Sequence, residues 1–69
     1  MIKLLMTSPP DRERVVAELW IGDVQLAEVS NEDGAFRVEL YTPLGSNRVE
    51  VRLDELEEAL RKARADLTY

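Results

Sequence analysis

Carboxylates are the side chains of this chain most able to do acid–base or metal chemistry, and there are 14 of them. The chain has no histidine and no cysteine. A Ser-His-Asp or Cys-His nucleophile therefore cannot be assembled, and disulfides and thiolate metal sites are excluded. We interpret adjacent carboxylates such as Glu57 and Glu58 as solvated helix residues. Because 69 residues enclose little volume, we expect no catalytic residues and no enzyme.

The stretch SNEDGAFRVEL has a superficial likeness to a calcium-binding loop around Asp33 and Gly34. If Gly34 takes the sixth position of such a loop, Val29 stands first and Leu40 twelfth. Both positions require oxygen ligands, so the match fails. The three glycines are isolated from one another, which excludes a glycine-rich phosphate cradle. We therefore expect no metal site and no cofactor.

The charge of the chain limits its partners. The net charge is −5, from 14 acidic and 9 basic residues. Nucleic-acid binding normally needs a basic footprint, so we expect no direct contact with nucleic acid. The acidity either serves only solubility or steers the protein toward a basic protein partner. No apolar run approaches the roughly 20 residues that span a bilayer, so we expect a cytoplasmic protein without a membrane segment.

The clearest predicted element is a helix over Arg52–Leu67. Asp54 is a suitable N-cap, and Glu57 follows it at capping-box spacing. Acidic residues fill the first turn and basic residues follow, in the order that the helix dipole favours. One apolar stripe recurs at helical spacing, formed by Leu56, Ala59, Leu60, Ala63 and Leu67.

Upstream of this helix, alternating apolar and polar residues predict strands separated by glycine-containing turns. Gly22-Asp23 and the NEDG stretch at 31–34 each close a hairpin. The sequence therefore predicts a single α+β domain over residues 1–69, an antiparallel β-meander of four to five strands with one C-terminal helix packed on one face. The predicted strands are Ile2–Thr7, Arg14–Ile21, Val24–Ser30, Ala35–Tyr41 and Arg48–Leu53, with a turn or short loop at 42–47.

The segment predicted as the strand Arg14–Ile21 could alternatively form a helix. Ser8 could cap a helix that begins with Pro9 and continues through Val15, Val16 and Trp20. The strand is favoured because Val, Trp and Ile cluster next to the tight glycine turn.

Pairing across the two hairpins predicts which face of the sheet is covered by the helix. That core face carries Val16, Trp20, Ala27, Val29, Phe36, Val38 and Leu40. The opposite face is then too apolar for a fully solvated surface, since it carries Val15, Ala17, Leu19, Ile21, Val24, Leu26 and Tyr41 among its charges. A bulge near Gly22 would turn Leu19 and Ile21 inward. Otherwise the N-terminal segment lies across this face, or the face binds another chain.

The third possibility defines the candidate partner-binding residues. The alternatives are that Trp20 lies in the core and that the carboxylates only form cross-strand pairs, such as Glu28 with Arg37. The apolar candidates are Trp20, Leu26 and Tyr41, and the acidic candidates are Glu28, Glu32, Asp33, Glu39 and Glu50.

Residues 14–67 carry a resemblance. The stretches AELWIGDVQLAEVS, FRVELY and LDELEEALRKARADL resemble small bacterial immunity proteins that neutralise interbacterial toxins, including those of contact-dependent inhibition systems. The resemblance implies a strand meander plus helix that binds one toxin domain and blocks its active site, without assigning a role to any single residue. In the last third, the LEEAL…A pattern is also similar to HicB-type antitoxins. Those proteins usually add a DNA-binding segment and carry a catalytic-looking remnant that is missing here.

Three classes of function remain open. The first is a toxin-neutralising protein whose carboxylates occupy the basic site of a nuclease-like toxin. The second is a self-associating or scaffold module, with the second sheet face as the seam of a homodimer. The third is an engineered small domain without a biological partner.

Overall fold

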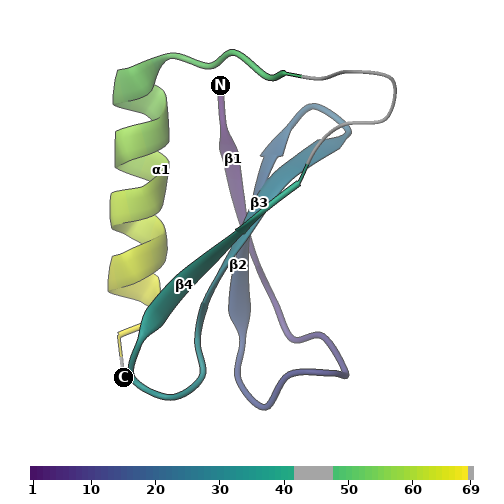
Figure 1. The fold of residues 1–69 in the computed structure, drawn as a ribbon, viewed down its shortest axis with the longest axis vertical. Helices are drawn as coiled ribbons and strands as arrows, with labels where there is room; N and C mark the ends of the chain where they lie inside the picture. The colour runs from purple at the N-terminus through teal and green to yellow at the C-terminus, as the bar shows by residue number, and fades with distance from the viewer. Residues whose placement is uncertain (42–47, 69) are drawn as a thin grey trace.

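A loop over residues 8–15 and two glycine turns join the strands into a meander (Figure 1). The computed structural model describes residues 1–41 and 48–68, and the turn or short loop predicted at 42–47 lies outside them. The strands are β1 (Lys3–Thr7), β2 (Val16–Ile21), β3 (Val24–Asn31) and β4 (Phe36–Leu40), and α1 spans Leu53–Asp66. The sheet order is β1-β2-β3-β4, and all neighbouring strands are antiparallel. The predicted α+β fold, a four-stranded meander with one C-terminal helix against it, is confirmed.

Two glycines supply the backbone conformations that the hairpins require. Gly22 has φ +58 and Gly34 has φ +86, and no other described residue has a positive φ. Asp23 therefore keeps a negative φ, so the β2–β3 turn has the pattern of a type II′ turn. In the β3–β4 loop, Asp33 Oδ1 accepts a hydrogen bond from Ala35 N at 3.3 Å, which is an Asx turn.

The segment before β2 is not helical. Residues 8–15 form a loop, with a turn in which Arg12 N donates to Pro9 O at 3.2 Å. Pro10 occupies the second position of this turn, where its fixed φ is favourable. The strand interpretation of the following residues is confirmed by β2.

The predicted fifth strand is wrong. Residues 48–52 belong to no strand, and α1 already begins at Leu53. Val49 remains 44% exposed. Alternation fixes which side chains can face inward, but it does not supply a hydrogen-bonding partner, and this segment leads across the end of the sheet to α1 (Figure 1).

The helix start also differs from the prediction. The N-cap is Arg52, whose side chain makes no capping hydrogen bond, so Asp54 lies within the first turn of α1. Asp54 instead accepts hydrogen bonds from Arg52 Nε at 3.0 Å and from Glu55 N at 2.9 Å. Its carboxylate still stabilises the helix, because it lies beside the positive end of the helix dipole.

The core lies between α1 and one face of the sheet. Leu19 and Leu67 are fully buried, and burying each leucine side chain is worth about 1.5–3 kcal/mol. Alanines at the helix contact allow α1 to approach the strands closely. The buried cluster consists of Ala17, Leu19, Ala27, Val29, Ala59, Ala63 and Leu67.

A β-bulge decides which residues of β2 enter this core. Next to the turn, Trp20 pairs with Gln25, but Leu19 pairs with Ala27, so Leu26 has no partner on β2. The extra residue turns Leu19 inward and Trp20 outward, and Leu26 also packs against the core. The predicted placement of Val16 and Trp20 on the face covered by α1 is therefore wrong, although Val16 is buried on the other face. The bulge alternative is correct for Leu19.

The register between β3 and β4 differs from the prediction without changing the faces. The structure pairs Val29 with Val38 and Asn31 with Phe36, whereas the sequence placed Val29 opposite Phe36. A shift by an even number of residues keeps side chains on the same face. The predicted face of Ala27, Val29 and Phe36 is consequently confirmed, and all three take part in the core. Val38 and Leu40 lie on the same face but are 49% and 77% exposed, so their predicted burial is wrong. The reason is that α1 packs mainly on β1, β2 and β3.

The reverse side of the sheet, called the outer face below, is partly covered. Val16 faces outward, since it pairs with Thr7 and neighbours the inward Ala17, yet it is 0% exposed. From the 8–15 loop, Arg12 reaches Glu28 and Arg14 donates to Asn31 O at 3.1 Å. This loop therefore folds over one end of the outer face. Coverage of this face by the N-terminal segment was one of the alternatives that the sequence left open.

Candidate protein-binding surface

Three glutamates stand in one row across the middle of the outer face. Glu18 of β2 pairs with Glu28 of β3, and Glu28 pairs with Glu39 of β4. We call Glu18, Glu28 and Glu39 the acidic row. Like charges placed directly opposite each other on neighbouring strands destabilise a sheet. This arrangement therefore needs either internal counter-charge or a function that repays its cost.

Arg12 supplies part of that counter-charge. Its guanidinium lies 2.9 Å from Glu28 Oε2 and 3.6 Å from Glu39 Oε1. The Glu28 side chain is only 12% exposed, so its carboxylate depends on this contact. The hydrogen bond and the charge of Glu28 raise the pKa of Arg12 above its ordinary value.

The Glu18 end of the row is held by neutral donors. Trp20 Nε1 donates to Glu18 Oε1 at 3.0 Å, and Thr7 Oγ1 donates to Glu18 Oε2 at 3.3 Å. These bonds orient the carboxylate without cancelling its charge. Three carboxylates against one guanidinium leave the row negative.

Two aromatic side chains flank the row on one side. Trp20 follows Glu18 by two residues and Tyr41 follows Glu39 by two residues. Because β2 and β4 run in the same direction in a meander, both rings lie on the same side of the row. Trp20 is half-buried and Tyr41 is 38% exposed, and the Tyr41 hydroxyl donates to Glu39 Oε1 at 3.2 Å. Desolvation and the negative charges of Glu28 and Glu39 raise the pKa of Tyr41.

Four of the predicted partner-binding residues therefore gather on one surface, namely Trp20, Glu28, Glu39 and Tyr41. The predicted pairing of Glu28 with Arg37 is not what the structure has, because Arg37 bonds to Asp33 at 2.7 Å and Glu28 faces Glu39. The Arg37 contact lowers the pKa of Asp33.

The other four candidates lie elsewhere. Leu26 packs against the core at the bulge. Glu32 and Asp33 belong to the β3–β4 loop, and Glu32 Oε1 is buried without a hydrogen-bond partner. Glu50 is exposed in the segment that precedes α1. None of the four contributes to the acidic row.

Glu18 and Arg12 were not identified from the sequence. Glu18 had one signal, since the predicted core positions of Val16 and Trp20 would have placed its carboxylate in the core as well. An unpaired buried carboxylate is costly, which indicates that Val16, Glu18 and Trp20 all face away from the core. Arg12 gave no local signal, because it reaches residues 16 and 27 positions away.

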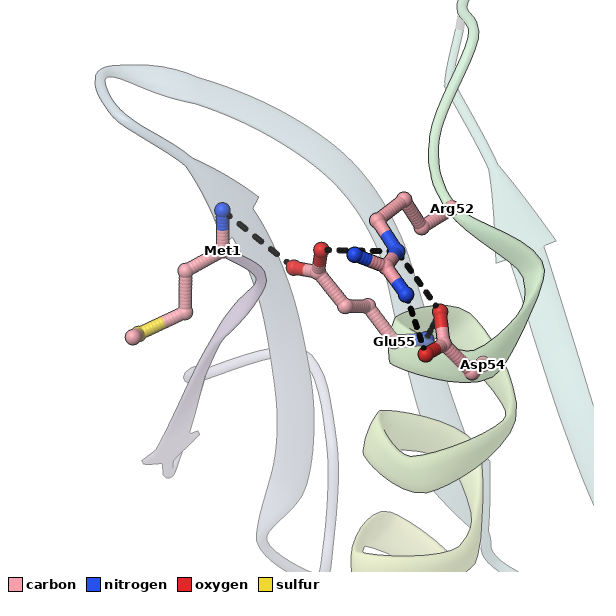
Figure 2. A network of polar contacts seen from close by, with 4 residues as sticks. All are labelled: Met1, Arg52, Asp54 and Glu55. Carbon is pink, nitrogen blue, oxygen red and sulfur yellow. Dashed lines mark hydrogen bonds and ion pairs between the residues drawn. The ribbon is translucent and has the colours of Figure 1, made fainter.

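Apart from the outer face, a concavity lies between the start of β1 and the first turns of α1. It encloses about 640 Å³ above Ile2, Leu4 and Ala59. Its acidic rim is already paired, because Glu55 lies 3.3 Å from the Met1 ammonium and Arg52 holds Asp54 at 2.8 Å (Figure 2). Glu58, also on the rim, pairs with Arg61 at 2.6 Å, which lowers the pKa of Glu58. The paired rim offers a ligand little free charge.

Comparison with known proteins adds no relative to this description. No family model matches the chain, and neither a curated protein nor a solved structure matches it. Within residues 1–41 and 48–68, no group of three or more acidic side chains is placed to hold a metal ion. In the same part of the chain, no helix is both long and apolar enough to cross a membrane. The fold and the surface define an α+β meander with an acidic face edged by aromatic rings.

Proposed function

We propose that this protein acts by binding a basic protein partner through its outer face. The observation that carries the proposal is the acidic row, in which Glu18, Glu28 and Glu39 stand in register with Arg12 as counter-charge. A folded protein gains no stability from opposing carboxylates on adjacent strands. A cationic side chain of a partner, placed over the row, would remove that repulsion on binding.

The aromatic residues fit the same role. Trp20 and Tyr41 lie side by side with the carboxylates and keep part of their ring surfaces accessible. Aromatic side chains bury large areas at little entropic cost and dominate many interfaces. Arginine side chains bind both groups, because their guanidinium pairs with carboxylates and stacks on aromatic faces.

The class of partner that we propose is a toxin domain with a basic active site. Enzymes that act on nucleic acids bind phosphates with arginine and lysine, so an acidic surface is a suitable plug for such a site. A net charge of −5 would also accelerate association with a basic target. The protein would then be a toxin-neutralising immunity protein that blocks the active site by occupation.

The experiment is co-expression with the toxin domain encoded next to this chain, with growth as the readout. We expect the wild-type chain to rescue growth and the E28K/E39K variant to fail. In vitro, the association rate with the purified toxin should fall as salt is added. Circular dichroism would establish that the variant is folded.

The matched control is E57K/E58K, which makes the same change of charge on exposed positions of α1. It should rescue growth as the wild type does, since net charge changes equally and the outer face does not. Equal loss of rescue by both variants would show that only overall charge matters. The absence of a neighbouring toxin, or rescue by E28K/E39K, would refute the proposal.

A further inference from the structure

β4 ends the sheet with an open edge. It is the last strand in the sheet order, so no strand among the described residues pairs with its far side. Tyr41 N donates to Leu26 O at 2.9 Å. Because backbone groups alternate in direction along an antiparallel strand, Arg37, Glu39 and Tyr41 point theirs toward β3. The N–H and C=O groups of Phe36, Val38 and Leu40 therefore point outward.

The side chains of that edge are apolar on the face that carries α1. Val38 is 49% exposed and Leu40 is 77% exposed. Between β4 and α1 lies a groove of about 180 Å³, formed by Phe36, Val38 and Leu60 and bordered by Arg64. The Arg64 guanidinium lies 4.9 Å from the centre of the Phe36 ring. Natural edge strands are usually protected by proline, inward charges or bulges, and β4 has none of these on this face.

We propose that a second copy of this chain occupies the edge, with the two β4 strands antiparallel about a two-fold axis at Val38. That register places Val38 opposite Val38 and Phe36 opposite Leu40 of the second copy. All of these residues have backbone groups on the open edge, so they form the hydrogen-bonded pairs. Arg37 then stands opposite Glu39 of the second copy as a non-hydrogen-bonded pair, the type in which side chains are closest.

Charge complementarity identifies the second copy as the occupant. The sequence FRVEL is self-complementary when it is reversed about Val38, because arginine meets glutamate and phenylalanine meets leucine on both sides of the axis. The other edge lacks this property. If β1 paired with itself about Leu5, Lys3 would face Thr7 and gain no counter-charge. Pairing of β1 with β4 would be head-to-tail and would leave edges open for continued growth.

The proposed geometry also closes the apolar groove. A two-fold axis perpendicular to the sheet keeps both helices on the same face of the joined sheet. Val38 and Leu40 of both copies then lie between the two helices, where they are removed from water. The acidic row stays on the accessible reverse face, and Glu39 belongs both to this row and to the proposed pair with Arg37 across the axis.

The test is sedimentation velocity of the purified chain from micromolar to millimolar concentration. We expect the wild type to pass from monomer to dimer. R37E places like charges opposite each other twice, once on each side of the axis, and so does E39R. Each variant should raise the dissociation constant about tenfold or more. The doubly exchanged variant R37E/E39R restores both pairs across the axis and should lower the constant again about tenfold relative to either single variant. It need not reach the wild-type value, because the exchange also separates Arg37 from Asp33 and Glu39 from Arg12 within each copy.

The matched control is K3E, which makes the same charge change as R37E on the other edge strand. It should leave dimerisation unchanged. Amide hydrogen exchange on the wild type supplies a readout that needs no substitution. At low concentration the amides of Phe36, Val38 and Leu40 should exchange faster than those of Arg37 and Glu39, and they should become protected as concentration rises.

A wild type that stays monomeric over the whole range would overturn the proposal. So would a dimer that is unaffected by R37E and E39R, or one in which K3E has the same effect as R37E. Concentration-dependent protection on β1 instead of β4 would equally exclude it. These results are separable from toxin neutralisation through R37E, because Arg37 lies outside the acidic row. R37E should weaken the dimer in sedimentation and still rescue growth, and loss of rescue by R37E would show that the two proposals share one surface.

Discussion

Glu28 and Glu39 stand directly opposite each other on β3 and β4, and the Arg12 guanidinium contacts both carboxylates. The contact joins a loop that precedes β2 to the centre of the outer face. It compensates a repulsion that the sheet register creates, so the loop position and the sheet register are energetically coupled.

The first prediction concerns this contact. R12M should lower the thermal unfolding midpoint, because it leaves the mostly buried Glu28 carboxylate without a counter-charge beside Glu39. E28Q should restore part of the loss in the R12M background, since the repulsion is then gone. The measurement is a double-mutant cycle by thermal denaturation. The control is R61M, whose partner Glu58 is exposed; if R61M costs as much as R12M, the coupling is no stronger than an ordinary surface ion pair.

The second prediction tests the faces set by the bulge. Leu19 is 0% exposed in the core, whereas Leu5 on the outer face is 43% exposed. L19A should therefore reduce the free energy of unfolding by about 2–5 kcal/mol. L5A should cost about 1 kcal/mol or less, because it leaves no closed cavity. Urea denaturation measures both, and a reversed order of the two losses would contradict the assigned faces.

The assignment of side chains to the two sheet faces shows how much of the fold could be predicted from the sequence. Alternation and the turn glycines predicted four strands, the meander and the helix, because those features depend on local spacing. The bulge at Leu26 has no glycine or proline to mark it, so continuous pairing from the Gly22 turn put Val16 and Trp20 on the wrong side. The decisive clue was energetic, since Glu18 lies between those two residues and cannot be buried without a partner.

The candidate surface was predictable to a similar extent. Residue type and charge selected Trp20, Glu28, Glu39 and Tyr41, and the structure brings these four together. Their neighbour Arg12 depends on the path of the 8–15 loop, which no periodic pattern encodes. Glu50 was selected on the premise of a fifth strand, and its place on the surface was lost when that segment proved to have no strand partner.

The third prediction concerns the ionisation of Tyr41. Burial together with the charges of Glu28 and Glu39 raises its pKa above the ordinary value, which is about 10 for an exposed tyrosine. The neutral phenol is therefore the form favoured by folding. The stability gained by keeping the Tyr41 phenol neutral is complete below the pKa that Tyr41 has in the unfolded chain. It is lost as the pH rises through the pKa of Tyr41 in the folded protein.

The measurement is an absorbance titration of the phenolate in a Y69F background, which leaves Tyr41 as the titrating tyrosine. We expect its midpoint to lie above that of the unfolded chain and to move down in E28Q. E57Q serves as the control, because it removes a carboxylate from α1. A midpoint at or below the unfolded value would show that Tyr41 is not held against the acidic row.

The last prediction concerns the junction between β3 and the end of α1. Asn31 is 7% exposed, and its Nδ2 donates to Leu67 O at 2.9 Å. In N31D, an ionised carboxylate would face a carbonyl at the negative end of the helix dipole and could not donate. The folded state should then favour the protonated acid, so its pKa should rise above the unfolded value of about 3.9.

A group whose pKa is raised by folding contributes stability that is complete below its pKa in the unfolded chain. That stability is lost as the pH rises through its pKa in the folded protein. The loss of stability relative to wild type should therefore be largest near neutral pH, about 1–3 kcal/mol or more, and should shrink as the solution is acidified. Urea denaturation of both proteins at several pH values measures this difference, and a loss that stays constant with pH would exclude the hydrogen bond as its cause.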